Sequence, residues 1–497
     1  MKFRKIIWKI LLVLFSLVSV IALASAMWYI RKYGDTGFMS IISTFLSPWT
    51  GCANSLKSSF ILFALLPATG ITAILAFLLL YKGKALLTVK EKQIYPLPGN
   101  WGVWLSLAIS IGCLIWAMCS VHFPAYLYDT FMTESTLYEE EYVDPDNVNI
   151  TFPEAKRNLI YIYLESMETS YFSEELGGGY SENLIPELYD LANENLNFSH
   201  SDAVGGWPRV THATWTSAAM VCQTSGVPLT VDIGKIDLSN FRGYLPGATT
   251  LQDILHNAGY YQTLMVGSDA SFGGRKEYYI DHGADHVYDL YTAREDGIIP
   301  EDYMVWWGFE DHKLFDYAKQ ELRKIADREQ PFAFSLLTVD THHIDGYDCD
   351  LCSHDHSEQY ANVLSCSSRQ VLNFVNWIRE QDFYENTTVI ICGDHPSMDQ
   401  QFFARNIPED YERHVYNCIL NAPLEAVNSK NRSFTPMDMF PTTLAAIGCE
   451  IEGDRLGLGT NLFSESATLA ERMGIDALNR EISKNSDYYT DHLISDP

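Results

Sequence analysis

Three long apolar runs occupy the first quarter of the chain, at residues 6–30, 59–81 and 101–121. Each run is close to the roughly 20 residues that a helix needs to cross a bilayer. A fourth apolar segment, residues 38–49, is too short to span one and is interpreted as interfacial. The alternative for the first run is a cleaved signal peptide, but the run is long for one and two more follow. The pattern therefore predicts a membrane domain over residues 1–121 with about three transmembrane helices.

From residue 158 onward, strand-like runs alternate with segments of helical periodicity. The strand-like runs are short and rich in β-branched and aliphatic residues, at 158–165, 261–269, 331–340 and 387–394. The helix-like segments lie between them, at 183–194, 249–260 and 368–381. Alternation of this kind is typical of an α/β fold with a mostly parallel sheet flanked by helices. We expect this domain to cover residues 158–469, after an acidic linker at 122–157 and before a polar tail at 470–497.

Basic residues near the apolar runs predict how the chain is oriented. The N-terminus and the segment after the second run carry Lys2, Arg4, Lys5, Lys82, Lys84, Lys90 and Lys92. Because basic flanks of membrane helices stay cytoplasmic, three spans place everything after about residue 122 outside the cytoplasm. The net charge of −29 also makes general binding to DNA or RNA phosphates unfavourable. We therefore expect a multi-pass cell-membrane protein with an extracytoplasmic α/β domain and no nucleic-acid partner.

Side chains that can bind metals follow three of the expected strands. Glu165 ends the first strand, Asp340-Thr341-His342-His343 end the strand at 331, and Asp394-His395 follow the strand at 387. A single polar strand end is common, but the carboxyl ends of parallel strands meet at one edge of the sheet. Asp, Glu and His suit Mn²⁺, Zn²⁺ or Mg²⁺. The pattern therefore predicts a metal site at this edge.

Residues 205–229 contain several hydroxyl side chains ahead of a helix-like run, TSAAMVCQ. A Thr or Ser at a helix N-terminus is usually a cap, but the free N–H groups and the helix dipole there also favour an anion. A metal that lowers the pKa of the hydroxyl would make such a residue a nucleophile. By this chemistry alone four candidates remain open: Thr211, Thr214, Thr216 and Ser217.

Several motifs, taken together, resemble a known family. They are the strand ending in Glu165, the segment NLIPELYDLANENLNF, a Thr at a helix start, LLTVDTHHIDGY, a later GDH and LGLGTNLFS. The set resembles the alkaline phosphatase superfamily, and most closely its sulfatase-like branch of lipoteichoic acid synthases and phosphoglycerol transferases. WTSAAMVCQTSGVPL is similar to the phosphoglycerol transferase nucleophile segment, in which Thr follows Trp. The likeness covers about residues 158–465 and the membrane layout, but the segment 205–214 does not align well.

The resemblance implies roles for individual residues. Thr216 matches the nucleophile, Arg275 matches an arginine that binds the substrate phosphate, and His343 matches a substrate-side histidine. The family's single divalent metal site, with Mn²⁺ expected and Zn²⁺ or Mg²⁺ as alternatives, is matched by Glu165, Thr216, Asp394 and His395. The nucleophile segment lacks the C/S-x-P-x-R motif of true sulfatases, so hydrolysis of sulfate esters is not expected. Without the resemblance, Arg275 could equally form a surface ion pair and His343 could cap a turn.

Outside the cytoplasm a phosphoryl-group transferase has no ATP and needs another activated donor, which membrane phospholipids provide. The resemblance implies transfer of a phosphoglycerol group from phosphatidylglycerol to a glycan or polyglycerol-phosphate acceptor through a covalent intermediate on Thr216. A phosphoethanolamine transferase and a phosphodiesterase of the same superfamily are the enzyme alternatives. A catalytically silent membrane receptor that keeps the fold for binding is the alternative from another class.

Three of the ten cysteines, Cys349, Cys352 and Cys366, lie in a polar stretch. In an oxidising exterior two of them can pair, and the resemblance implies Cys352 with Cys366, with Cys349 as the competing partner of Cys352. Cys349-x-x-Cys352 with nearby histidines is also a spacing typical of zinc sites, although the chain has no second such pair.

Overall fold

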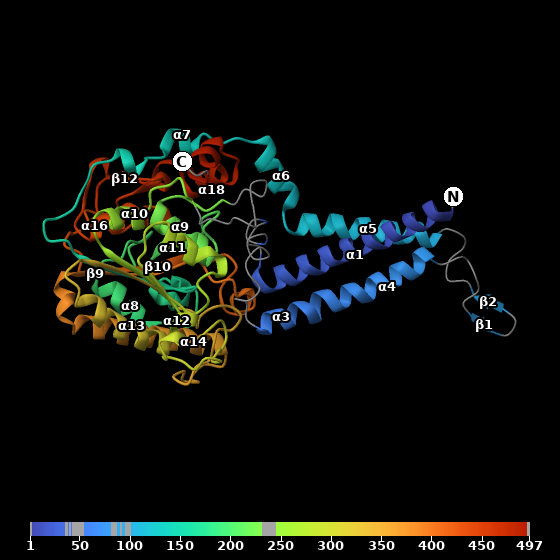
Figure 1. Ribbon diagram of the computed structural model, residues 1–497, viewed down its shortest axis with the longest axis horizontal. Coiled ribbons are helices and arrows are strands. Elements are labelled where there is room, and N and C mark those ends of the chain that lie inside the picture. The colour runs from blue at the N-terminus through green and yellow to red at the C-terminus, as the bar shows by residue number, and fades with distance from the viewer. Residues whose placement is uncertain are drawn as a thin grey trace. The chain divides into compact units, whose positions relative to one another are not determined.

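The computed structural model describes residues 2–34, 38, 41, 54–80, 87–89, 92–94, 101–230 and 245–494 of the 497-residue chain (Figure 1). The chain divides into two compact units, one of residues 1–41 and 53–128 and the other of residues 42–52 and 129–497. Apart from residues 38 and 41, the segment 38–49 that we expect to be interfacial lies outside the described residues.

Apolar helices build the first unit. They are α1 Lys2–Tyr33, α3 Asn54–Phe60, which continues through the π-helical turn η2 Ile61–Leu65 into α4 Leu66–Leu80, and α5 Trp101–Ser120. A hairpin of β1 Leu87–Val89 and β2 Lys92–Ile94 lies between α4 and α5 in the chain. Within the described residues, three spans are long and apolar enough to cross a membrane: Ile6–Tyr33, Leu56–Leu80 and Trp101–Ser120. The three apolar runs are thus confirmed as helices of the kind that membrane proteins contain.

Small residues bring these helices together. A Cβ atom at Gly102 of α5 would overlap the Leu78 carbonyl of α4. The Ser110 Oγ atom of α5 lies 2.8 Å from the Ser16 Oγ atom of α1. Close backbone approach and hydroxyl hydrogen bonds are what associate helices in a bilayer, where burial of apolar surface gives no advantage. Large apolar side chains of the same helices remain exposed, including Trp101, Trp104 and Trp116, as expected of a surface covered by lipid.

A seven-stranded sheet organises the second unit. Its spatial order is β5-β10-β9-β4-β8-β6-β7. The strands are β4 Asn158–Leu164, β5 Gly206–Pro208, β6 Tyr261–Val266, β7 His286–Tyr288, β8 Phe332–Leu337, β9 Thr387–Gly393 and β10 His414–Leu420. The five strands from β9 to β7 are parallel, while β10 is antiparallel to both of its neighbours. The expected α/β fold class with a mostly parallel sheet is confirmed.

Helices cover both faces of this sheet (Figure 1). On one face Leu159, Tyr161 and Tyr163 of β4 join a core built with α9 Thr216–Ser225, α10 Leu251–Asn257, α11 Arg275–Asp281 and α16 Met439–Ala446. On the other face Ile160, Ile162 and Leu164 pack with α8 Pro186–Glu194, α13 Asp311–Ala326 and α14 Gln359–Arg379. Burial on both faces explains why the strands are continuous apolar runs and do not alternate with polar residues.

Some helices and strands begin or end at other residues than the sequence pattern predicts. The helix expected at 368–381 begins nine residues earlier, because α14 spans Gln359–Arg379 and buries its first turns under the sheet. The strand expected at 331–340 ends at Leu337, and a turn follows in which the His342 N–H donates to the Val339 carbonyl at 3.0 Å. The helix α8 begins at Pro186, a residue whose fixed φ and missing N–H suit the first helical position.

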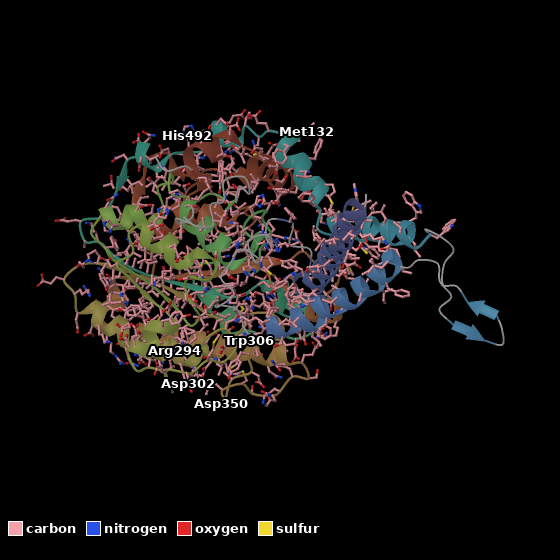
Figure 2. All side chains as sticks on the ribbon, turned by 45° about the vertical axis from the view of Figure 1, so that its right-hand side comes forward. Met132, Arg294, Asp302, Trp306, Asp350 and His492 are labelled. Carbon is pink, nitrogen blue, oxygen red and sulfur yellow. The ribbon has the colours of Figure 1, made fainter. Side chains whose placement is uncertain are left out.

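The segments on either side of the α/β core also pack onto it. Leu137 and Tyr138, in the acidic segment 122–157, are buried in the core, as are Leu478 and Ile482 of the segment 470–497. The two segments meet where the Ser135 N–H donates to the Asn485 carbonyl, 2.8 Å away, and Met132 and His492 lie on the same side of the unit in Figure 2. Both segments are therefore anchored to the core, and the domain limits drawn from the sequence stay predictions.

Shorter elements complete this unit. Its shorter α-helices are α7 Leu137–Glu141, α12 Leu290–Glu295, α15 Gln400–Asn406, α17 Leu469–Met473 and α18 Ile475–Ser483. The helix α6 Phe123–Met132 contains the boundary between the two units, which falls after residue 128. Two-residue strands pair as β3 Ile150–Thr151 with β11 Glu450–Ile451 and β12 Arg455–Leu456 with β13 Gly459–Thr460.

A buried ion pair joins two loops at the carboxyl edge of the sheet. Glu168, in the loop after β4, is fully buried and accepts two hydrogen bonds from the Arg413 guanidinium. Glu168 Oε1 also accepts from the Ser397 N–H at 2.8 Å. Arg413 Nη2 donates in addition to the Ser397 carbonyl at 2.7 Å. This network holds the loop after β9 against the loop after β4.

Removing the cation from this pair should destabilise the second unit strongly, because it leaves the Glu168 carboxylate buried without a counter-charge. We expect Arg413→Ala to lower the free energy of unfolding by about 3 kcal/mol. The matched control is Arg405→Ala, which breaks the exposed Arg405–Glu358 pair and should cost less than about 1 kcal/mol. Urea denaturation of both variants compares the two losses, and equal losses would contradict this account.

Candidate metal centre and nucleophile

The pairing of two neighbouring strands brings the candidate ligands together. β4 and β9 are parallel and pair Leu164 opposite Gly393. The next residues, Glu165 and Asp394, therefore leave the sheet side by side, and the Asp394 N–H donates to the Leu164 carbonyl at 3.2 Å. A Cβ atom at Gly393 would overlap the Met167 carbonyl oxygen, so glycine is required for this close approach.

Glu165, Asp394 and His395 form a buried cluster whose ligand atoms all lie within 4.8 Å of one another. The His395 Nε2 atom is 3.3 Å from Asp394 Oδ2 and 3.7 Å from Glu165 Oε1. The other ring nitrogen, Nδ1, lies 3.0 Å from the Pro396 carbonyl, which can only accept a hydrogen bond. Nδ1 therefore carries a proton, and Nε2 faces the carboxylates.

The hydrogen bonds of Asp394 leave one oxygen free for a cation. Asp394 Oδ1 accepts from the backbone N–H groups of Ser166 and His395, both at 2.8 Å. Asp394 Oδ2 is buried and has no hydrogen-bond donor in the described part of the chain. A buried carboxylate oxygen without a donor is costly unless a positive charge faces it. The donor set of two carboxylates and one imidazole nitrogen suits a divalent cation, so these residues fit a metal site.

The charges of the cluster act strongly on one another. Burial, followed by the neighbouring Glu165 charge, raises the pKa of Asp394 to about 7. Burial opposes ionisation of Glu165 as well, but the charges of His342 and His395 outweigh it and lower the pKa of Glu165. Burial would lower the pKa of His395, yet Asp394 and Glu165 raise it overall. The two carboxylates thus repel each other and attract any positive charge placed between them.

Among the four hydroxyl candidates, Thr216 is the one that contacts this cluster, where the Ser166 hydroxyl also donates to Glu165 Oε1 at 2.8 Å. Thr216 is the first residue of α9, and its Oγ1 atom donates to Glu165 Oε2 at 3.1 Å and lies 3.4 Å from His395 Nε2. Trp215 at the N-cap gives no side-chain cap, so the N–H groups of the first turn are available to an anion beside the hydroxyl.

The other three hydroxyl candidates lie elsewhere. The Thr211 N–H bonds the Asn479 side chain, Thr214 is buried, and a Cβ atom at Gly273 would overlap the Ser217 Oγ atom. Among the described hydrogen bonds of the four candidates, only those of Thr216 reach Glu165 and His395. The position of Thr216 therefore agrees with its choice from the sequence, and its catalytic role stays a prediction.

Arg275 lies buried beside the cluster. Two glycines in left-handed conformation, Gly273 and Gly274, turn the chain so that α11 begins at Arg275. Its Nε and Nη2 atoms donate to the Phe272 carbonyl, the Ser268 hydroxyl and the Asp269 carbonyl, which hold the guanidinium in place. Burial lowers the pKa of Arg275, and the charges of Glu165 and three aspartates, Asp394 among them, counteract this. A fixed cation next to a carboxylate cluster suits recognition of a phosphate.

His342 lies close enough to this cluster for its charge to act on Glu165, although the family resemblance assigns the substrate role to its neighbour His343. Burial lowers the pKa of His342, and the charges of Glu165, His395 and Arg275 all act on it. Its ring packs 4.6 Å from Trp307 and 4.3 Å from the His343 ring, measured between ring centroids. The His343 side chain is the more buried of the two. The substrate role assigned to His343 stays a prediction.

Asp340 does not join the cluster, although it lies at the end of the strand-like run. It pairs instead with Asp311 at the start of α13. Asp311 accepts from the Val339 and Asp340 N–H groups at 2.8 and 3.0 Å, and Asp340 Oδ2 accepts from the Asp311 N–H at 3.1 Å. Burial raises the pKa of Asp311 to about 7, and burial and the Asp311 charge raise the pKa of Asp340 well above its ordinary value.

This pair should make stability depend on pH. Between about pH 4 and pH 7 the folded chain keeps protons on Asp311 and Asp340 that an unfolded chain has released, so the pair contributes stability that is lost as the pH rises. Asp340→Asn removes one of the two charges and can keep the hydrogen bond to the Asp311 N–H. We expect the Tm of Asp340→Asn minus the Tm of the parent to increase as the pH rises from about 5 to about 7. Asp316→Asn, at an exposed site on α13, is the control; parallel pH profiles of Asp340→Asn and the parent would contradict the prediction.

Comparison with known proteins identifies a family and several proteins to which the chain is similar. The sulfatase family model matches residues 157–449. Phosphoglycerol transferase I of Escherichia fergusonii is 29% identical over 322 residues, which are 63% of this chain and 40% of that protein. Phosphoglycerol transferase I of Escherichia coli O6:K15:H31 is 30% identical over 321 residues, with the same two coverages. The chain thus aligns with about two fifths of the length of these relatives.

A solved structure shares the fold. The crystal structure of a protein in the alkaline phosphatase superfamily from Vibrio parahaemolyticus aligns with a TM-score of 0.50 and 20% sequence identity. The alignment covers 66% of this chain and 76% of that one. At this identity the likeness concerns the fold, and the site rests on the residues described above.

Proposed function

Because the chain belongs to the sulfatase family, we propose that it is a membrane-anchored phosphoglycerol transferase. It moves a glycerol-phosphate group from phosphatidylglycerol to a glycan or polyglycerol-phosphate acceptor. The observation that carries the proposal is the Thr216 hydroxyl at the start of α9, hydrogen-bonded to Glu165 and beside His395. The relatives named phosphoglycerol transferase I support this head group.

The metal part of the proposal is a single divalent cation, Mn²⁺ by expectation and Zn²⁺ or Mg²⁺ as alternatives. It would be held by Glu165, Thr216, Asp394 and His395, whose ligand atoms cluster at the carboxyl edge of the sheet. When bound, such an ion lowers the pKa of the hydroxyl and offsets the charge of the phosphate. Asp394 and Glu165 supply the negative charge, and His395 presents its Nε2 atom.

In the first half-reaction, each of these residues has a separate role. The Thr216 oxygen attacks the phosphorus, its bond to phosphorus forms as the bond to the diacylglycerol oxygen breaks, and the hydroxyl proton leaves toward Glu165 Oε2. Arg275 and the free N–H groups at the start of α9 bind the phosphate oxygens, which offsets the strongly acidic field of the protein. A substrate-side histidine, His343 by the sequence motif or His342 by its coupling to Glu165, protonates the departing diacylglycerol oxygen.

The second half-reaction reverses these roles. An acceptor hydroxyl attacks the phosphorus of the Thr216 adduct, loses its proton to the same histidine, and releases the Thr216 oxygen. The phosphodiester energy of the lipid drives the transfer, so no nucleotide is needed outside the cytoplasm. This places the catalytic unit on the extracytoplasmic side of a multi-pass cell-membrane protein, in line with the basic residues that flank the first two spans.

Removal of a ligand tests the metal centre. We expect Asp394→Ala to lose most of its bound metal and head-group turnover while staying folded, because the remaining ligands no longer complete the site. Elemental analysis of metal per chain, with circular dichroism to check the fold, measures this. The control is Asp316→Ala on the exposed face of α13, and metal content equal to the parent in Asp394→Ala would disprove the assignment.

Replacement of the nucleophile tests the chemistry. We expect Thr216→Ala to lose head-group transfer by orders of magnitude with metal still partly bound, since the attacking oxygen is gone. Thr211→Ala, Thr214→Ala and Ser217→Ala are matched controls from the same segment and should keep most activity. Incubation with labelled phosphatidylglycerol should leave a phosphoglycerol adduct on the peptide that contains Thr216, mapped by mass spectrometry.

Several outcomes would contradict parts of this proposal. An adduct on Thr214, or full activity in Thr216→Ala, would refute the nucleophile. A preference for labelled phosphatidylethanolamine would favour phosphoethanolamine transfer, and free glycerol phosphate with no acceptor product would favour a phosphodiesterase. Bound metal without any head-group turnover would favour a silent receptor.

A further inference from the structure

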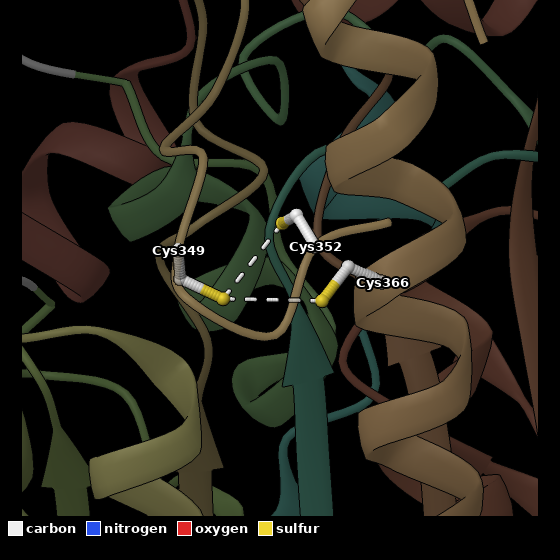
Figure 3. Close-up of side chains that lie close together, drawn as sticks. All are labelled: Cys349, Cys352 and Cys366. Atoms are coloured by element: carbon white, nitrogen blue, oxygen red, sulfur yellow. Dashed lines mark hydrogen bonds between the residues drawn. The ribbon is translucent and has the colours of Figure 1, made fainter. Parts of the chain in front are cut away.

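A second cluster of metal-binding side chains lies outside the site described above. It contains Cys349, Cys352 and Cys366, whose sulfur atoms all lie within 4.8 Å of one another. Cys349 Sγ is 3.7 Å from Cys352 Sγ and 3.9 Å from Cys366 Sγ (Figure 3). Cys349 and Cys366 are buried and Cys352 is partly exposed. All three are free thiols, so the Cys352–Cys366 disulfide expected from the family resemblance is not formed in this structure.

The fold brings these thiols together from two elements. Cys349 and Cys352 belong to the loop between β8 and α14, where the Cys352 N–H donates to the Cys349 carbonyl at 2.9 Å and closes a tight turn. Asp350, between them, lies at the surface in Figure 2. Cys366 comes from α14 and faces this turn (Figure 3). The loop is tied back to the end of β8 because the Tyr347 N–H donates to the Asp340 carbonyl at 2.7 Å.

The sulfur spacing matches that of thiolates around one ion. Zinc–sulfur bonds are about 2.3 Å long, so two sulfurs of a tetrahedral site lie about 3.8 Å apart. The two distances from Cys349, 3.7 and 3.9 Å, bracket that value. A disulfide would instead bring two sulfurs to about 2.05 Å and leave the third thiol unused. The spacing therefore favours a shared ion over any one pairing.

A hydrogen-bond donor faces the sulfur cluster. The buried Gln370 side chain donates from Nε2 to Cys366 Sγ at 3.2 Å and to Cys349 Sγ at 3.8 Å. His354 and His356 do not belong to the sulfur cluster, since they contact Asp348 and Glu182. The ligand atoms of the cluster are thus three sulfurs.

We propose that Cys349, Cys352 and Cys366 form a second metal site, which binds a thiophilic divalent cation of the Zn²⁺ class. Each thiol loses a proton to the solvent as its sulfur binds the ion, and the fourth position faces the partly exposed Cys352 side. Three sulfurs select a soft cation, whereas the oxygen and nitrogen ligands at Glu165 select a harder one. The ion clips the β8–α14 loop, which carries His342, onto α14.

Cobalt is the probe that tests this site. Co²⁺ bound to thiolates has a sulfur-to-metal charge-transfer band that oxygen and nitrogen ligands do not produce. Reduced, metal-free, full-length protein in detergent, titrated with Co²⁺ without oxygen, should develop this band, and added Zn²⁺ should abolish it. The band should be lost in Cys366→Ser and also in Cys352→Ser, whose partly exposed position tolerates the change. Cys449→Ser, at a buried cysteine outside the cluster, should keep it.

Stability supplies an independent readout. Zn²⁺ should raise the Tm of the reduced parent and of Cys449→Ser more than that of Cys366→Ser or Cys352→Ser. All four proteins keep the site at Glu165, but only the first two keep the sulfur site, and an ion stabilises the folded state only where it binds. Reduced protein that shows no charge-transfer band would overturn the proposal, as would a band that persists in both cluster variants. Thiols that pair in a mapped disulfide and, once reduced, bind no Co²⁺ would show a redox pair in place of the metal site.

Discussion

The parallel pairing of β4 with β9 is the constraint on which the rest of the site depends. Leu164 lies opposite Gly393, so Glu165, Asp394 and His395 leave the sheet at one point. A shift of one residue would turn these side chains to the other face of the sheet. The backbone fit at Gly393 and the buried Glu168–Arg413 pair hold the two following loops in that register. A rigid, doubly covered sheet thus positions ligands more accurately than loops alone can.

The charges of the chain and of the candidate site explain which groups surround Glu165 and Asp394. The chain carries a net charge of −29, and its candidate site gathers two buried carboxylates. Three features oppose that field: the Arg275 guanidinium, His342 and the uncapped N-terminus of α9. Each comes from a different segment of the chain. An anionic substrate at this site would depend on these groups to oppose the acidic charge of the rest of the protein.

Much of the architecture could be predicted from the sequence. The three apolar helices, the α/β class and the family resemblance are confirmed, because apolar run length and strand–helix alternation are local signals. The strand ends at Glu165 and Asp394-His395 could be found for the same reason. Asp340 looked equivalent to them, yet it pairs with Asp311 across the loop. The sequence pattern did not predict the early start of α14 or the packing of residues 470–494, since burial by distant segments decided both.

The sequence alone determined which chemical groups stand at the ends of which strands, because side-chain type and hydrophobic periodicity are properties of each segment by itself. Only the tertiary structure decided which of those groups meet. It brought Thr216 to Glu165, separated Asp340 from the cluster, and gathered three cysteines from a loop and a helix. These outcomes depend on strand register and on helix packing between residues far apart in the chain. Such contacts produce no periodic pattern of hydrophobic and polar residues in the segments that make them.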